Sequence, residues 1–152
     1  MKKLLFVFLM LFFVGCSVKT TPVYAVIKTP KIKISDQGFL KEGFGYKEII
    51  IYKTGLKPFK VTIKNSYICL NSKCMDKEKF VKEYLGKNYP VDIFDLIIEG
   101  KPIKNFGKIT KIKSGFIQRK ESIFYKVQKD KVLFRDKNQN IIIMVKRLRE
   151  KG

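Results

Sequence analysis

Short stretches in which apolar and polar residues alternate, with turns between them, constrain the fold of this chain more than any other feature. The alternation is clear at residues 31–34, 59–64 and 109–113, where Ile, Val or Phe alternates with Lys or Thr. Successive side chains of a β-strand point to opposite faces, so each stretch predicts a strand with one buried face. Residues 48–53 and 140–148 are richer in Ile and Val and predict central strands. The connections are short and rich in Gly, Pro, Asn and Asp, which favours hairpins and an antiparallel sheet.

The middle of the chain has a helical pattern instead. Asp76 can cap a helix that ends at Gly86, and Pro90 can begin a second helix that ends at Gly100. Apolar side chains at helical spacing form one stripe on each helix: Phe80, Val81, Tyr84 and Leu85 on the first, and Phe94, Ile97 and Ile98 on the second. We therefore predict an α+β fold, in which a curved antiparallel sheet carries a helical hairpin inserted midway and packed over its concave face.

The N-terminus resembles the signal peptide of a bacterial lipoprotein. Lys2 and Lys3 precede an apolar run at residues 4–14, which is shorter than the roughly 20 residues that a membrane-spanning helix needs. Gly15 and Cys16 end this run as a lipobox does. The resemblance implies that residues 1–15 are removed and that Cys16 becomes a lipidated N-terminus. An ordinary cleaved signal and a short core helix are the alternatives.

The residue after the cysteine bears on the membrane in which such a lipoprotein resides. In the lipoprotein families that supply the resemblance, Asp at this position retains the protein at the inner membrane. Ser17 therefore implies the outer membrane, with the domain facing the periplasm. We expect residues 16–22 to form the lipidated cysteine and a tether, and residues 23–152 to form one domain. Two or three acyl chains would anchor it firmly, because each buried methylene contributes about 0.8 kcal/mol.

Two further cysteines flank a predicted two-residue turn at Asn71 and Ser72. Counting back from this turn, Cys69 faces Cys74 at a non-hydrogen-bonded position of a hairpin, where side chains approach closely. We predict a structural disulfide, which fits an oxidising compartment and contributes roughly 2 kcal/mol across so small a loop. A redox-active pair is the alternative, although the spacing is not Cys-x-x-Cys.

The residue types that most catalytic sites need are missing. The chain of 152 residues has no His, which excludes mechanisms that use imidazole as base, relay or metal ligand. Three Cys without His are too few for a structural zinc site, and neither a Gly-rich phosphate loop nor a nucleophile elbow occurs. Asp92 and Asp95 are the closest pair of carboxylates, but at the start of a helix they simply favour its positive end. We expect no enzyme activity, no cofactor and no metal.

The order of the predicted elements resembles that of LolB, the outer-membrane receptor of bacterial lipoprotein sorting, and more distantly that of LolA, its periplasmic carrier. The resemblance covers most of residues 31–148. It includes the strand at 48–52, the loop at 53–57, the strand at 59–63, an insert that ends at 85–86, the segments 89–91 and 96–102, and the strands at 124–127, 133–136 and 141–145. The chain departs from the family at residues 23–27, which look extended where the family has a helix, and in having no Trp.

This resemblance implies a half-open barrel of antiparallel strands, closed by helices over a hydrophobic cavity that accepts acyl chains. Such a receptor takes acylated lipoproteins from a LolA-like carrier and helps to insert them in the outer membrane. In the family, an exposed leucine on a protruding loop is needed for membrane delivery, and that position falls on Leu56. The other interpretation of Leu56 is a minor exposed apolar residue at a strand connection.

An acyl-chain receptor needs a concave apolar wall and a lid that can open, but no catalytic group. Twelve apolar residues are candidates for this wall: Ile34, Phe39, Ile49, Ile51, Val61, Ile63, Phe94, Ile97, Phe124, Phe134, Ile143 and Val145. An alternating pattern does not distinguish the wall of a cavity from a closed core. A filled core is therefore the alternative interpretation of each of these residues.

Basic residues outnumber acidic ones by 33 to 13, which gives a formal charge of +20. Residues 101–120 contain seven basic residues and no acid: Lys101, Lys104, Lys108, Lys111, Lys113, Arg119 and Lys120. They favour a surface for anionic lipid head groups or for an acidic carrier, and solvated strand faces are the alternative. The secretion signal argues against nucleic acid. The second hypothesis is accordingly a structural or assembly lipoprotein whose basic face binds an anionic envelope component, and in both cases we expect a monomer.

Overall fold

The computed structural model describes residues 15, 17–86 and 88–149, and its main element is one antiparallel sheet of eleven strands. The predicted lipidation site Cys16 and residues 1–14 of the predicted signal peptide lie outside the described residues. The strands are β1 (Lys19–Lys28), β2 (Lys33–Gly43), β3 (Tyr46–Ile51), β4 (Phe59–Lys64), β5 (Tyr67–Leu70), β6 (Lys73–Asp76), β7 (Lys108–Ile112), β8 (Gly115–Lys120), β9 (Ile123–Gln128), β10 (Lys131–Asp136) and β11 (Ile141–Arg147).

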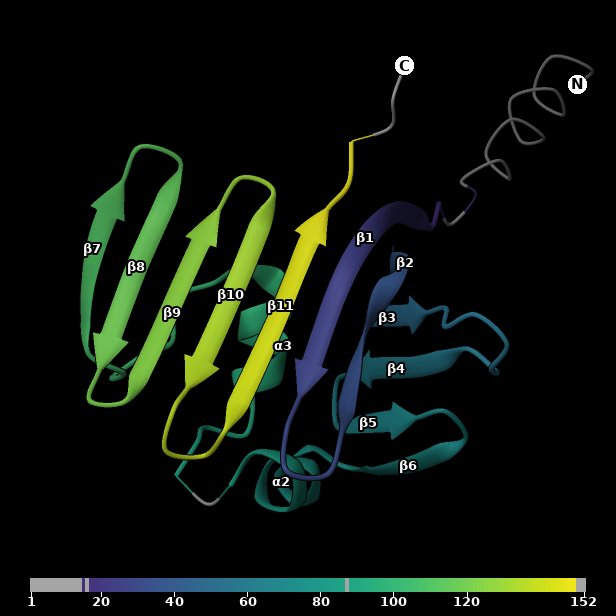
Figure 1. The fold of residues 1–152 in the computed structure, drawn as a ribbon, viewed down its shortest axis with the longest axis horizontal. Helices are drawn as coiled ribbons and strands as arrows, with labels where there is room; N and C mark the ends of the chain where they lie inside the picture. The colour runs from purple at the N-terminus through teal and green to yellow at the C-terminus, as the bar shows by residue number, and fades with distance from the viewer. Residues whose placement is uncertain (1–14, 16, 87, 150–152) are drawn as a thin grey trace, which may run out of the picture.

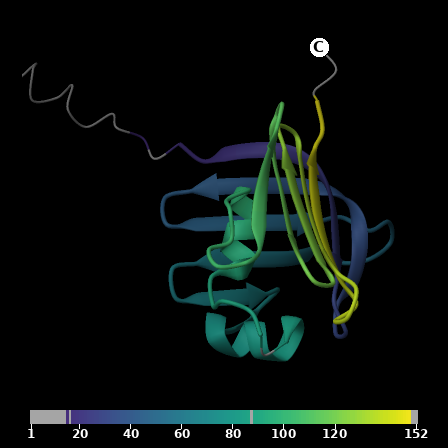
Figure 2. The same ribbon diagram turned by 90° about the vertical axis from the view of Figure 1, so that its left-hand side faces the viewer.

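The sheet is curved and does not close into a barrel. Its strand order is β6-β5-β4-β3-β2-β1-β11-β10-β9-β8-β7, so β6 and β7 are its two edges (Figure 1). Neighbours in the sheet are also neighbours along the chain, except where β1 pairs with β11 and joins the two halves. Figure 2 shows these halves turned toward each other, with a helix between them and another at the lower end of the view. The prediction of a curved antiparallel sheet with short inserted helices is confirmed.

The insert between β6 and β7 contains three short helical elements: α2 (Lys77–Phe80), the π-helical turn η1 (Val81–Leu85) and α3 (Ile93–Glu99). Asp76 precedes α2 as predicted, but its side chain makes no capping hydrogen bond. Gly100 ends α3 in the left-handed conformation, with φ of 67°. A Cβ at this position would also lie 3.2 Å from Val127 Cγ1, so glycine allows α3 to end close against the sheet.

The hydrophobic core lies between the concave face of the sheet and this insert. Alternate positions of the strands are buried, as in Val23, Ala25 and Ile27 of β1. The insert contributes four buried residues from α3 (Ile93, Phe94, Ile97 and Ile98) and three from α2 and η1 (Phe80, Val81 and Leu85). The rings of Phe80 and Phe94 meet edge to face at 5.3 Å, so the two helices share one apolar cluster with the strands.

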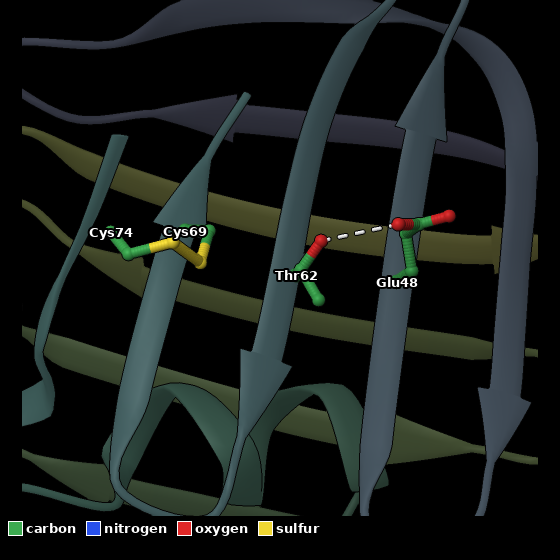
Figure 3. The surroundings of a disulfide bond; sticks show 4 residues. All are labelled: Glu48, Thr62, Cys69 and Cys74. Atoms are coloured by element: carbon green, nitrogen blue, oxygen red, sulfur yellow. Dashed lines mark hydrogen bonds between the residues drawn. A yellow bond between two sulfur atoms is a disulfide. The ribbon is translucent and has the colours of Figure 1, made fainter. Parts of the chain in front are cut away.

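The disulfide predicted from the register of the β5–β6 hairpin is present. Leu70 lies opposite Lys73, and Cys69 lies opposite Cys74 with an S–S bond. Asn71 in the turn has φ of 53°, a left-handed conformation that Asn tolerates better than most residues. Figure 3 shows the disulfide beside Thr62, whose hydroxyl donates a hydrogen bond to Glu48 of β3. The disulfide therefore ties the edge strand β6 to the sheet.

Two boundaries near the N-terminus differ from the sequence-based expectation. β1 begins at Lys19, so four residues expected in the tether belong to the first strand. Residues 31 and 32 were expected in a strand but form the β1–β2 connection, because the Thr29 hydroxyl accepts hydrogen bonds from both backbone N–H groups. The strand predicted at residues 23–27, where the LolB family has a helix, is confirmed within β1.

Candidate functional site

The concave face of the sheet forms an apolar surface against which the insert packs. Nine of the twelve predicted wall residues are buried in this cluster: Ile49, Ile51, Val61, Ile63, Phe94, Ile97, Phe134, Ile143 and Val145. Ile34 is half-buried and packs at the edge of the same cluster. Strands from both halves of the sheet therefore bring these residues together around α3. In this structure the insert occupies the space between the two halves.

Phe39 and Phe124 lie on the opposite, convex face of the sheet, and their assignment to the concave wall is wrong. Phe39 is 40% exposed, whereas its neighbour Leu40 is fully buried. Phe124 is half-buried beneath the Arg119 guanidinium, and the next residue, Tyr125, is the one that points inward. Neighbouring residues of a strand point to opposite faces, so only one of the two alternating sets of side chains can face the core. An aromatic residue alone does not show which of the two sets is the buried one.

Two buried polar side chains of the sheet hold the insert through its backbone. The Tyr125 hydroxyl of β9 lies 3.1 Å from the Leu96 carbonyl and 3.0 Å from the Lys101 carbonyl, at the end of α3. The Gln118 amide of β8 accepts a hydrogen bond from the Ile103 N–H at 3.1 Å and donates one to the Ile103 carbonyl at 2.6 Å. Burial raises the pKa of Tyr125, so its hydroxyl remains a donor. Neither residue is among the site residues predicted from the sequence.

Ion pairs add further connections to the insert. Glu99 of α3 lies 2.8 Å from Lys47 Nζ of β3 and 2.6 Å from Lys101 Nζ. Burial alone would raise the pKa of Glu99, but hydrogen bonds from these two lysines hold it below its ordinary value. Lys77 of α2 lies 2.6 Å from Asp95 of α3 and joins the two helices to each other. Asp95, expected only to favour the helix start, is thus part of a contact inside the insert.

Two adjoining clefts open where the insert meets the ends of β8 and β10. Their volumes are about 300 and 530 Å³. Both are lined by Asn88, Tyr89, Phe106 and Lys120. Neither cleft is lined by any of the twelve wall candidates, which are buried deeper or lie elsewhere. These two clefts therefore lie at the edge of the insert, beside the apolar cluster.

Asp136, at the end of β10, organises the wall of the smaller cleft. Its carboxylate accepts hydrogen bonds from the hydroxyls of Tyr89 and Ser122 and from the backbone N–H groups of Asn138 and Gln139. Burial alone would raise the pKa of Asp136, but these hydrogen bonds hold it below its ordinary value. The charged carboxylate thus joins the segment after η1 to two turns of the sheet.

Acidification is therefore expected to remove stability that Asp136 provides. Because its pKa is lower in the folded than in the unfolded protein, the contribution is complete above the ordinary carboxyl pKa of about 3.9 and is lost as the pH falls through the folded-state value. Urea unfolding of the wild type and of Asp136→Asn at a series of acidic pH values measures this. The substituted chain should be less stable near neutrality and should lose less on acidification, whereas parallel curves would contradict the assignment.

Leu56 lies in the β3–β4 loop and is 64% exposed. Its neighbours in this loop include Lys53 and Lys57, both exposed. The structure also has a second exposed apolar tip that the sequence analysis missed: Phe44, in the β2–β3 turn, is 98% exposed. These tips lie at opposite ends of β3, as Figure 2 shows for the two connections. The β2–β3 turn is the one close to the beginning of β1, because Lys19 pairs with Glu42.

The seven basic residues of the segment 101–120 do not share one face. Lys108 and Arg119 lie directly opposite each other on the convex face, whereas Lys111 and Lys120 lie on the other face of the same hairpin. The remaining three lie outside the strands: Lys101, Lys104 and Lys113. All seven are exposed, and Lys101 is the member paired with Glu99. Which basic residues share a surface therefore depends on how the strands pair, and not on their closeness along the sequence.

Comparison with known proteins leaves the family of this chain open. No protein-family model matches the chain, and no curated protein sequence matches it. Among the described residues, no helix has the length and apolar character needed to cross a membrane. On its geometry alone, the candidate site consists of the apolar cluster under the insert, the clefts beside it and the exposed loop tip at Leu56.

Proposed function

We propose that the protein is a lipid-anchored outer-membrane lipoprotein with LolB-like activity, which binds the acyl chains of lipoproteins received from a LolA-like carrier and helps to insert them in the membrane. The observation that supports this proposal is the continuous apolar cluster between a curved sheet and a short helical insert. An acyl chain would be buried there by the hydrophobic effect, at about 25 cal/mol per Å² of apolar surface removed from water.

In this proposal the sheet is a half-open barrel and the insert is its lid. Among the described residues, few side chains of the strands make polar contacts with this part of the insert: Lys47 and Tyr125 contact α3, and Gln118 contacts Ile103 in the segment after it. Movement of the insert away from β9 and β10 would expose the concave wall while the eleven-stranded sheet keeps its own hydrogen bonds. The clefts lined by Tyr89 and Phe106 mark the edge at which such an opening would begin. Binding and release then need no chemical step and no bound nucleotide.

Delivery would use the β3–β4 loop. Leu56 is exposed beside two lysines, a combination that suits contact with a bilayer whose head groups are anionic. Replacing Leu56 by glutamate is expected to block delivery to the membrane while leaving cargo binding intact, because this loop lies outside the apolar cluster. Thr54→Glu is the matched control, since it adds the same charge to the same loop without removing an apolar residue.

The experiment mixes the chain from Ser17 onward with a LolA-like carrier loaded with an acylated lipoprotein and follows the cargo by pull-down. Every described strand and helix lies between Lys19 and Arg147, so this chain retains the described fold. Transfer of the cargo is the expected result. The anchored protein and its Leu56→Glu, Thr54→Glu and Phe44→Glu variants are then compared for delivery to vesicles. Absence of any transfer to the folded chain would contradict the proposed receptor, and arrest by Phe44→Glu alone would move the delivery role to the β2–β3 turn.

A further inference from the structure

The face of the sheet that points away from the helices carries a row of cations across seven neighbouring strands. Directly opposite residues of antiparallel strands share a face, so the register defines this row. From β7 to β2 the convex cationic row consists of Lys108, Arg119, Phe124, Arg135, Ile142, Lys28 and Lys33. In Figure 1 the strands β7–β11 present this face to the viewer, with α3 behind them. Five cations, with two apolar side chains among them, thus extend over most of the width of the sheet.

The pairing on this face places like charges directly opposite each other. There are three such pairs: Lys108 with Arg119, Lys28 with Lys33, and Lys131 with Lys146. Within the described part of the chain, none of these six cations forms an ion pair with an acidic side chain.

Elsewhere the same sheet pairs opposite charges, since Lys41 faces Glu48 and Glu42 faces Lys47. Like charges directly opposite each other destabilise a sheet, so folding alone does not favour the three cationic pairs. An anion from outside the chain would relieve this repulsion.

A shallow cleft of about 340 Å³ lies on the row and is lined by its members Arg119, Phe124 and Arg135. Phe124 lies between Arg119 and Arg135 in the register, and the Arg119 guanidinium is 5.1 Å from its ring centroid. Leu133 and Lys137 also line the cleft. Its other lining residues are Glu121, which is its single acid, Ser122 and Ile123. The cleft therefore offers three cations around an apolar floor, which fits a phosphate group carried next to apolar carbon.

We propose that the convex cationic row docks on the phosphate groups of an anionic lipid surface. A lipid surface is favoured over a soluble polyanion because the apolar residues Phe124 and Ile142 lie between cations of the row, and a head-group layer presents apolar carbon beside its phosphates. On a neighbouring row of the same face, Leu133 lies opposite Met144, and both are half-buried. This inference rests on the convex face alone and does not depend on acyl-chain binding under the insert.

The test uses the chain from Ser17 onward, which lacks the predicted lipid anchor, and vesicles of phosphatidylcholine with or without a third of phosphatidylglycerol. Sedimentation should show binding to the anionic vesicles, no binding to the neutral ones, and a loss of binding as salt is added. The double variant Arg119→Gln/Arg135→Gln should bind roughly 30-fold more weakly, because each basic side chain near an anionic membrane contributes about fivefold. Both arginines are exposed, so the variant should fold normally.

The matched control is Lys73→Gln/Lys104→Gln, which removes the same charge at two exposed positions outside the convex cationic row. It should keep most of the binding. Equal losses in both variants would overturn the proposal, since binding would then follow net charge rather than this face. Wild-type binding by the arginine variant would also overturn it, and so would binding to soluble polyphosphate without binding to vesicles. These outcomes leave cargo transfer from the carrier unaffected, so the two proposals fail separately.

Discussion

Replacing Lys77 by methionine is expected to lower the free energy of unfolding by about 3 kcal/mol. The Lys77 side chain is 9% exposed, and its ammonium group lies 2.6 Å from Asp95 Oδ1. The other oxygen of this carboxylate is buried and has no hydrogen-bond partner in the described part of the protein. Methionine keeps the aliphatic packing but leaves the Asp95 charge uncompensated where α2 meets α3. The loss of the counter-charge therefore dominates the effect.

Two further variants separate the ion pair from other causes. In Lys77→Met/Asp95→Asn the uncompensated charge is gone, so most of the lost stability should return. In Lys79→Met, on the same helix, an exposed pair with Glu83 at 3.9 Å is removed, and a change of less than about 1 kcal/mol is expected. Urea denaturation followed by circular dichroism measures all three. A Lys77→Met chain as stable as Lys79→Met would show that this contact does not hold the insert together.

The sheet could be predicted from the sequence because its signals are local. Alternation over four to six residues fixes a strand, and a two-residue turn fixes the register of a hairpin, as it did for Cys69 and Cys74. The predicted strand at residues 31–34 begins too early, since β2 starts at Lys33. The Thr29 hydroxyl accepts hydrogen bonds from the backbone at residues 31 and 32 and turns the chain there, although the alternation of side chains continues through these residues. Side-chain capping of this kind has no periodic signature.

The contacts that define the candidate site could not be predicted in the same way. Gln118 and Tyr125 occupy ordinary inward positions of their strands, and their partners lie 15 or more residues away along the chain. The convex cationic row joins residues from 28 to 142 through the single β1–β11 pairing, which a search for basic segments in the sequence does not find. Both features depend on long-range register. The apolar residues of the concave wall could therefore be predicted from the sequence, whereas the polar residues that hold the insert to it could not.

Replacing Tyr125 by phenylalanine is expected to strengthen the binding of an acyl probe if the insert is a lid. The ring is fully buried and remains in place, whereas the hydrogen bonds from its hydroxyl to the Leu96 and Lys101 carbonyls are lost. The single hydroxyl proton is shared between the two carbonyls, and this shared hydrogen bond contributes about 1 kcal/mol to the closed form, so the open form should become roughly fivefold more populated. Probe affinity rises with the fraction of molecules that are open, because only these can bind.

If the apolar cluster is a closed core and the insert is not a lid, a different result is expected for the same variant. Without a lid, Tyr125→Phe should lower the free energy of unfolding by about 1 kcal/mol and leave the binding of a fluorescent fatty acid unchanged or absent. Phe116→Leu is the control, since it alters a neighbouring ring, 5.5 Å from that of Tyr125, without removing a hydrogen bond to the insert. Tighter binding in Tyr125→Phe but not in Phe116→Leu would connect affinity to release of α3. Equal binding in the wild type and both variants would mean that the apolar cluster is only the core of the fold, and the search for function would then move to the convex face.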